Sequence, residues 1–249
     1  WPAIAEFAWL TLPESATASY TLHTQLQKLS LPCNSATDQV IRLCADKYQL
    51  LDGLAKNGVA VPNQFKLTKP EYDSDTAGAL NRLENQVGYP MVVRPLDGAY
   101  SSGVQLLNTR LELQAYTRLL FRPSAAEGQE ARRILRLPPG TLFPQKAALA
   151  AAPQVSRKAG HQLLEISAHL YPEFVPGQSV KYHWLPISEV QPNGHILRSN
   201  EKYEQAIKYS RTPARFASEE GVNWSIQQQL EKVARLLDLK SPANFDAFV

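Results

Sequence analysis

The segment from residue 88 to residue 103 constrains this chain more than any other part of it. The apolar run Met91–Val93 ends in one cation, Arg94, and is followed at once by a loop with Gly98, two serines and Gly103. Backbone N–H groups approach phosphate oxygens closely only where side chains are small, and a fixed guanidinium holds phosphate bidentately. The segment predicts a strand followed by a polyphosphate-binding loop. A plain β-hairpin with a Gly-Ser turn and one exposed Arg has the same pattern.

The loop matches neither of the common nucleotide-binding motifs. No Gly-Lys-Ser/Thr follows the glycines, so the loop is not a Walker A motif. Gly98 and Gly103 lack the G-x-G-x-x-G spacing, and no helix-forming run begins directly after them, so the loop is not a dinucleotide fingerprint either. A different kind of phosphate-binding loop is expected.

Length and charge narrow the possible partners. A chain of 249 residues buries enough surface for one large domain or two small ones. The net charge of +3, from 26 Lys and Arg against 23 Asp and Glu, is too small to indicate a nucleic-acid or membrane surface. The one basic cluster, Arg132, Arg133 and Arg136, lies beside prolines and is interpreted as a solvated loop. We therefore expect neither nucleic acid nor a membrane as a partner.

The cysteines and the chain ends suggest a cytoplasmic location and a longer protein. Cys33 and Cys44 have no Cys or His near enough in sequence to complete a zinc site, and are interpreted as reduced, packed residues. No apolar run of 18 residues and no signal peptide is visible, so we expect a cytoplasmic protein. Because the sequence starts at Trp1 and stops at Val249 inside an expected strand, both ends are interpreted as cuts.

Hydrophobic periodicity predicts alternating helices and strands. Asp46 is the expected N-cap of a helix, with Gln49 placed to return the hydrogen bond and Gly58 as the stop signal. The other expected elements are helices around Leu22–Leu29, Leu80–Val87, Leu111–Phe121 and Ile226–Leu237, strands at 64–68, 91–93, 104–107, 163–175, 179–185 and 244–249, a turn at Asn193–Gly194, and a long loop or flap at 123–158. Because the order is not a regular βαβ repeat, we expect an α+β fold with mixed or antiparallel sheets.

Four short motifs occur in an order that is similar to that of a known superfamily. They are Asp46-Lys47, Arg94 with its Gly-Ser loop, the Pro-Glu-Phe-Val-Pro-Gly run at 172–177, and Asn244-Phe245-Asp246. This order resembles the ATP-grasp superfamily of carboxylate–amine ligases, over roughly 12–249. The resemblance implies two α+β subdomains that clamp a nucleotide. It divides the chain into a remnant of an N-terminal α/β domain with linker helices (1–58), a nucleotide-gripping subdomain (59–170) and a second subdomain (171–249).

The resemblance also implies which residues contact ATP. Lys47 and Arg94 match cations that contact the phosphates, and Arg94 is the expected catalytic residue through charge neutralisation. The residues that match the flexible loop closing over the triphosphate are Asp97, Gly98, Tyr100, Ser101, Ser102 and Gly103. The strand Glu173, Phe174 and Val175 matches the hinge between the subdomains, where backbone groups bond the adenine edge. Gln178 stands near the place where the family has an acidic residue for the ribose.

The resemblance assigns Mg²⁺ to the end of the chain. Asp246 matches the first magnesium ligand on a closing strand, and the family's second ligand should follow about a dozen residues later, after Val249. Its absence indicates either a longer protein or a degenerate one. Arg198, Arg211 and Arg215 are candidates for binding the substrate carboxylate or the γ-phosphate, and structural salt bridges are the alternative for each.

The implied reaction is γ-phosphoryl transfer from MgATP to a small-molecule carboxylate, followed by attack of a small-molecule amine on the acylphosphate. Such chemistry depends on positioning and charge neutralisation rather than on a side-chain nucleophile. The helices before Asp46-Lys47 are most similar to the tyramine–glutamate-ligase branch and to carbamoyl-phosphate-synthetase-like proteins, and a homo-oligomer is possible. The alternative is a non-catalytic nucleotide-binding or scaffold protein, which Gln178 and the missing second metal ligand favour.

Overall fold

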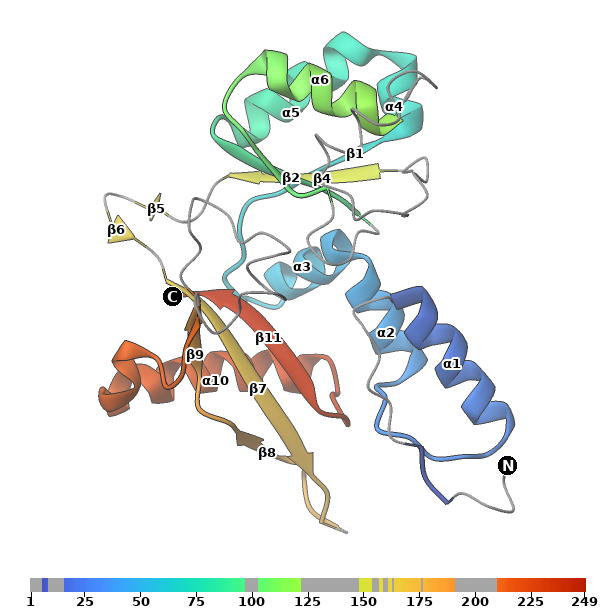
Figure 1. The fold of residues 1–249 in the computed structure, drawn as a ribbon, viewed down its shortest axis with the longest axis vertical. Coiled ribbons are helices and arrows are strands. Elements are labelled where there is room, and N and C mark those ends of the chain that lie inside the picture. The colour runs from blue at the N-terminus through green and yellow to red at the C-terminus, as the bar shows by residue number, and fades with distance from the viewer. Residues whose placement is uncertain are drawn as a thin grey trace. The chain divides into compact units, whose positions relative to one another are not determined.

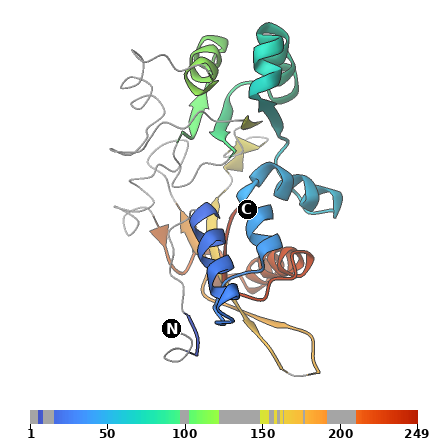
Figure 2. The same cartoon turned by 90° about the vertical axis from the view of Figure 1, so that its right-hand side faces the viewer.

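The computed structural model describes residues 6–8, 16–96, 103–121, 148–153, 157–158, 161–162, 164–175, 177–190 and 210–249. The chain forms two compact units (Figures 1 and 2). The central unit comprises residues 61–162 and 192–208, and the terminal unit comprises 1–60, 163–191 and 209–249. Within the described residues, no helix combines the length and the apolar character that a membrane span needs.

The central unit is built on a four-stranded antiparallel sheet. Its strands are β1 (Phe65–Thr68), β2 (Met91–Pro95), β3 (Gln105–Leu107) and β4 (Ala148–Pro153), in the order β1-β4-β2-β3. The helices α4 (Lys69–Ser74), α5 (Thr76–Val87) and α6 (Arg110–Phe121) lie on one side of this sheet (Figure 1). We call this side the covered face and the opposite side the outer face.

Alternation along β2 explains how the central sheet is packed. Met91 and Val93 are fully buried in a core with Leu80, Leu83 and residues of α6, whereas the alternate residues Val92 and Arg94 point to the outer face. Burial of each large apolar side chain contributes about 1.5–3 kcal/mol to stability. The hydrophobic pattern therefore fixes which face of β2 carries Arg94.

The terminal unit is built on a five-stranded sheet. Strands β10 (Ser210–Arg211), β9 (Ser188–Val190), β7 (Glu165–Glu173) and β11 (Ala243–Phe248) lie in that order, and β8 (Lys181–Trp184) also pairs with β7. The helix α10 (Glu220–Leu236) runs behind this sheet (Figure 1), and its Leu230 and Ala234 pack against β7. A short 3₁₀ helix, η2 (Arg215–Ser218), precedes α10, and the two-residue strands β5 (Arg157–Lys158) and β6 (His161–Gln162) pair with each other.

The first 60 residues are part of the terminal unit. They form α1 (Ala16–Lys28), α2 (Asp38–Ala45) and α3 (Lys47–Lys56). Val40 of α2 is buried with Leu170 and Ala234, and Lys232 of α10 donates a hydrogen bond to the Gly58 carbonyl at 3.0 Å. Clustering therefore groups the expected segment 1–58 with the terminal unit, where α2 packs against β7 and α10.

Other expectations have mixed outcomes. The α+β class and the antiparallel sheets are confirmed. The expected boundary at 170–171 falls inside β7, and the chain changes unit at 162–163 instead. Part of the expected flap at 123–158 is β4, which is bonded to a strand on each side. Residues 122–147 and the expected turn at Asn193–Gly194 lie outside the described residues.

Candidate functional site

Arg94 lies on the outer face of the central sheet. It is half-buried, and its register partner on β4 is Ala150. Because the neighbouring residues Val93 and Pro95 point to the covered face, the guanidinium extends from the side that α4, α5 and α6 do not cover. This placement fits the expected contact with an anion.

Lys66 is a second cation on the same outer face, which sequence analysis missed. Ala150 is the register partner of Lys66 as well as of Arg94, so the three residues form one row across β1, β4 and β2. Two strand spacings separate the two cations, which is about 10 Å. The sequence did contain a signal for this placement, since Lys66 stands between the apolar residues Phe65 and Leu67 in an expected strand. Leu67 is buried in the core, and Lys66 therefore points to the outer face.

The end of the glycine-rich loop is anchored to the central unit. Gly103 has φ +76, and a Cβ at this position would lie 2.8 Å from Cγ of Pro95. The fully buried Tyr116 hydroxyl donates to the Gly103 carbonyl at 2.8 Å, and burial raises the pKa of Tyr116. Only glycine therefore fits without strain here. The other expected loop residues, Asp97, Gly98, Tyr100, Ser101 and Ser102, lie outside the described residues.

Lys47 is the first residue of α3, as the sequence predicted. The Asp46 carboxylate accepts hydrogen bonds from the backbone N–H groups of Tyr48 and Gln49 at 3.1 and 3.0 Å, and the Gln49 amide donates to it at 2.9 Å. The expected N-cap is confirmed. Lys47 thus begins a helix in the terminal unit, where its side chain is half-buried.

Asp246 lies on the outer face of the terminal sheet, opposite α10. Phe245 and Ala247 point the other way and pack against the core, while Asn244 and Asp246 are exposed. The Asn244 amide nitrogen donates to Oδ1 of Asp246 at 3.2 Å, and the Ser167 hydroxyl donates to Oδ1 of Asn244 at 2.9 Å. Among the described residues, no group of three or more His, Cys, Asp or Glu gathers to hold a metal. A metal at Asp246 would need further oxygen ligands from a bound molecule.

Glu173, Phe174 and Val175 lie at a turn rather than where the chain crosses between units. Glu173 ends β7, the Gln178 N–H donates to the Val175 carbonyl at 3.0 Å, and β8 runs back beside β7 in a projecting hairpin (Figure 2). Glu173 contacts His183 at 2.6 Å, and this hydrogen bond lowers the pKa of Glu173. The chain instead crosses between units at 60–61 and 162–163, and at 191–192 and 208–209. The expected hinge residues are therefore not at a crossing.

The described arginine candidates have structural surroundings. Glu189 of β9 is completely buried, and its carboxylate accepts from the Arg215 backbone N–H at 3.0 Å and lies 2.8 Å from the Arg215 Nε. Arg211 is the register partner of Glu189, so both residues lie on the covered face. Arg198 lies outside the described residues. Arg215 therefore fits the salt-bridge alternative.

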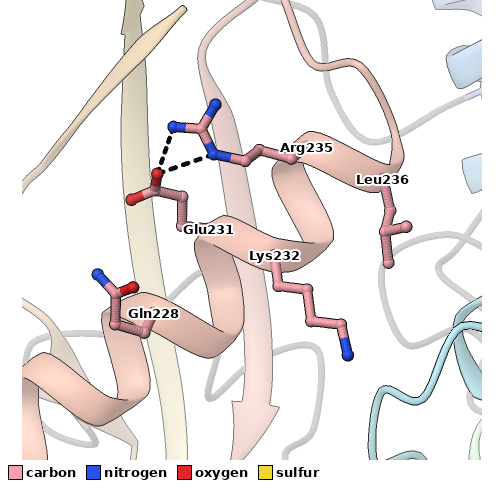
Figure 3. Close-up of a pocket in the computed structure, with 5 residues that line it drawn as sticks. All are labelled: Gln228, Glu231, Lys232, Arg235 and Leu236. Atoms are coloured by element: carbon pink, nitrogen blue, oxygen red, sulfur yellow. Dashed lines mark hydrogen bonds and ion pairs between the residues drawn. The ribbon is translucent and has the colours of Figure 1, made fainter.

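A shallow depression on α10 is lined by Gln228, Glu231, Lys232, Arg235 and Leu236 (Figure 3). Glu231 is hydrogen-bonded to Arg235 at 2.9 Å, and Arg235 also donates to the Val180 carbonyl at 3.3 Å. Lys232 points away from this pair, toward the Gly58 carbonyl that it bonds (Figure 3). These contacts fasten α10 to its own unit, so we assign the depression no chemistry.

Comparisons with known proteins point to one group of enzymes. No family model matches the chain. A D-alanine–D-alanine ligase of Leptospira interrogans is 22% identical over 216 residues, which is 87% of this chain and 53% of the relative. One from Bacillus pumilus is 30% identical over 93 residues, 36% of this chain and 26% of the relative. The chain spans about half the length of the Leptospira relative.

Solved structures share the fold. The VanG D-Ala:D-Ser ligase from Enterococcus faecalis has a TM-score of 0.67 at 15% identity, over 98% of this chain and 59% of that one. The D-alanine–D-alanine ligase from Bacillus anthracis, solved in complex with ATP, has a TM-score of 0.62 at 17% identity, over 99% of this chain and 63% of that one. These proteins are D-alanine–D-alanine and D-Ala:D-Ser ligases, and the likeness to the tyramine–glutamate-ligase branch stays a prediction. The ATP-grasp fold and the resemblance to the ATP-grasp superfamily of carboxylate–amine ligases are confirmed.

Proposed function

We propose that this chain is the nucleotide-binding part of an ATP-dependent ligase that joins a small-molecule amine to a small-molecule carboxylate. The observation that carries the proposal is the 216-residue likeness to a D-alanine–D-alanine ligase, on a chain with the same fold as such ligases. The γ-phosphoryl group of ATP is transferred to a carboxylate oxygen and ADP leaves. The amine nitrogen then attacks the acylphosphate carbon, phosphate leaves with the bonding pair of its C–O bond, and the nitrogen loses a proton.

The chain's own residues supply charge and position. Arg94, with Lys66 in the same row, offers positive charge to phosphate oxygens on the outer face of the central sheet. Lys47 adds a third cation, and it begins a helix whose first N–H groups are already capped by the Asp46 carboxylate. Gly103 ends the expected phosphate loop in a backbone conformation that suits glycine.

Asp246 is compatible with Mg²⁺. Magnesium takes oxygen ligands and is held in many nucleotide enzymes by one or two carboxylates together with substrate phosphates. Asp246 offers one exposed carboxylate with its Oδ1 already hydrogen-bonded, which fits one position of such a set. When bound, the ion supplies positive charge to the phosphate oxygens.

The relatives suggest the substrate class. Their names state that they join D-alanine to D-alanine, or D-alanine to D-serine. We infer that the carboxylate and the amine of this protein both come from small amino acids, with D-alanine and D-serine as the first candidates. The cytoplasmic location and the homo-oligomeric state of the protein remain predictions from the sequence.

The test is ADP release by the complete protein with MgATP and a panel of D- and L-amino acids offered singly and in pairs. We expect ADP release that needs an amino acid and is lost in the Asp246→Asn variant. ATP binding by calorimetry without ADP release for any pair would contradict the ligase and support the non-catalytic alternative.

A further inference from the structure

A directed chain of hydrogen bonds on the outer face of the terminal sheet ends at Asp246. Ser167 of β7 is the register partner of Asp246 on β11, and Asn244 is two residues before Asp246 on the same face. The Ser167 hydroxyl lies 2.9 Å from Oδ1 of Asn244, and Nδ2 of Asn244 lies 3.2 Å from Oδ1 of Asp246. These side-chain hydrogen bonds link β7 to β11 in addition to the backbone hydrogen bonds between the two strands.

The chemistry of the groups fixes the direction of this chain. An ionised carboxylate only accepts hydrogen bonds, so the group of Asn244 that faces Asp246 must be its NH₂. The amide oxygen then faces Ser167, whose hydroxyl is the donor. A flip of the amide would break both bonds and place an oxygen beside the carboxylate. Asn244 is therefore held in one orientation by its two neighbours.

Stability does not explain this arrangement. Ser167 is half-buried, Asn244 and Asp246 are exposed, and the two strands are already joined by their backbone ladder. Hydrogen bonds between water-exposed side chains add little to folding, because water replaces them when they break. Groups that bond a metal-ligating carboxylate, in contrast, fix its direction, and their loss typically weakens metal binding by about 10- to 100-fold.

We infer that Asn244 and Ser167 are positioning residues that hold the Asp246 carboxylate in the orientation in which it takes a divalent cation together with a nucleotide. The inference rests on the proposed function, because Asp246 has this role only if the chain binds a metal–nucleotide complex. Asn244 acts directly on the carboxylate, and Ser167 acts through Asn244. The effect of Asn244 should therefore exceed that of Ser167.

The experiment measures binding rather than turnover. Calorimetry on the complete protein gives the Kd of ADP in EDTA and again in Mn²⁺, and the ratio of the two is the metal enhancement. We expect Asp246→Asn to abolish the enhancement, Asn244→Ala to reduce it about 10-fold and Ser167→Ala about 3-fold, with the Kd in EDTA unchanged in the last two variants. Ser167→Thr, which keeps the hydroxyl, should restore most of it.

Matched controls remove an amide or a hydroxyl elsewhere. Asn85 on α5 and Ser225 on α10 are not part of the hydrogen-bonded chain at Asp246, and Asn85→Ala and Ser225→Ala should keep the wild-type enhancement. Circular dichroism and the melting temperature in EDTA verify that each variant is folded. Absence of any enhancement in the wild type would contradict the proposed function. Loss of enhancement in Asp246→Asn, with full enhancement in Asn244→Ala and Ser167→Ala, would overturn this inference alone.

Discussion

The two large sheets formed by the described residues share one plan and differ in the charged residues on both their faces. Each is antiparallel, with helices on one side. Among the described residues, the outer face of the central sheet carries the cations Lys66 and Arg94. The outer face of the terminal sheet carries Asp246 with its amide and hydroxyl neighbours, and farther along β7 it carries the Glu173–Lys181 pair. A cationic face binds phosphate directly, and a carboxylate face binds it only through a metal. Under the proposed function, the same architecture therefore provides two different ways to contact a phosphate.

The covered faces differ as well. The buried strand residues on the covered face of the central sheet are apolar, among them Leu67, Met91 and Val93. On the covered face of the terminal sheet, Glu189 is completely buried and is held by Arg215, whose side chain is 51% exposed. The covered face of the terminal sheet therefore combines apolar packing with a buried ion pair.

The largest expected effect is on the terminal unit's stability. Arg215→Met removes the guanidinium that lies 2.8 Å from the buried Glu189 carboxylate, and removal of one partner from a buried pair costs about 3 kcal/mol. Because Arg215 is half-exposed, we place the loss at the lower end of such values. Urea unfolding measures it. Lys240→Met is the matched control, because Lys240 pairs at 2.7 Å with Asp238, whose side chain is 73% exposed. Equal unfolding midpoints for the two variants would contradict the prediction.

The next effect distinguishes the two outer faces. Arg94→Met removes the guanidinium that the central sheet offers to phosphate, and a charged hydrogen bond contributes about 1.5–3 kcal/mol. We expect ADP binding to weaken about 10- to 100-fold in EDTA and in Mn²⁺ alike. The Asp246→Asn variant should lose affinity relative to wild type only when the metal is present. If Arg94→Met changed the affinity for ADP only in the presence of Mn²⁺, the proposed difference between direct phosphate binding at Arg94 and metal-mediated binding at Asp246 would be wrong.

Gly103 tests how the hairpin of the central sheet is closed. Its φ is +76, and an added Cβ would lie 2.8 Å from Cγ of Pro95, so alanine here is strained by about 1–2 kcal/mol. Gly103→Ala should therefore lower the free energy of unfolding by that amount and weaken ADP binding. Gly53→Ala is the control, because a Cβ there meets nothing within 4 Å. Equal stability of the two variants would show that the loop end relaxes freely.

The sequence predicted correctly those elements that depend on residues close together in the chain. Asp46 and Gln49 predicted the start of α3 because capping depends on residues three apart, and the alternation of apolar residues predicted β2. The sequence predicted a loop or flap where β4 lies, because β4 is rich in alanine and alanine is uncommon in strands. The segment forms a strand because β1 and β2 both bond to it, and those partners are distant in sequence.

The expected site was predictable in its residue types and less so in its placement. Arg94 follows an apolar run and Asp246 lies within one, and each is on the outer face of its sheet. Glu173–Val175 ends a strand before Pro176, and a strand ends in the same way whether the chain crosses to another unit or turns back. Only long-range contacts separate those two cases. Lys66 was missed because it is distant from Arg94 in sequence, and only the register of β4 places the two cations in one row.

Lys66 gives a smaller effect on the same central face. Lys66→Ala should weaken ADP binding about 3-fold, since a partly exposed cation about 10 Å from Arg94 acts mainly through screened Coulomb attraction. Raising the salt concentration should reduce the difference between variant and wild type. Lys69→Ala is the control, because Lys69 lies on α4 and is bonded to Asp73 at 2.5 Å. An equal loss of ADP affinity in Lys69→Ala would mean that the net charge of the protein, and not the position of Lys66 on the outer face, causes the effect.

The last test uses two exposed phenylalanines to locate the nucleotide base. Phe248 is 45% exposed on the outer face that carries Asp246, and Phe174 is 55% exposed at the β7–β8 turn. Loss of an apolar ring from such a contact costs about 1 kcal/mol, so Phe248→Ala should weaken ADP binding about 5-fold. Phe174→Ala should leave the Kd within about 2-fold of wild type, because its turn is not at a crossing between units. The opposite pattern would restore the hinge that the sequence predicted at Glu173–Val175.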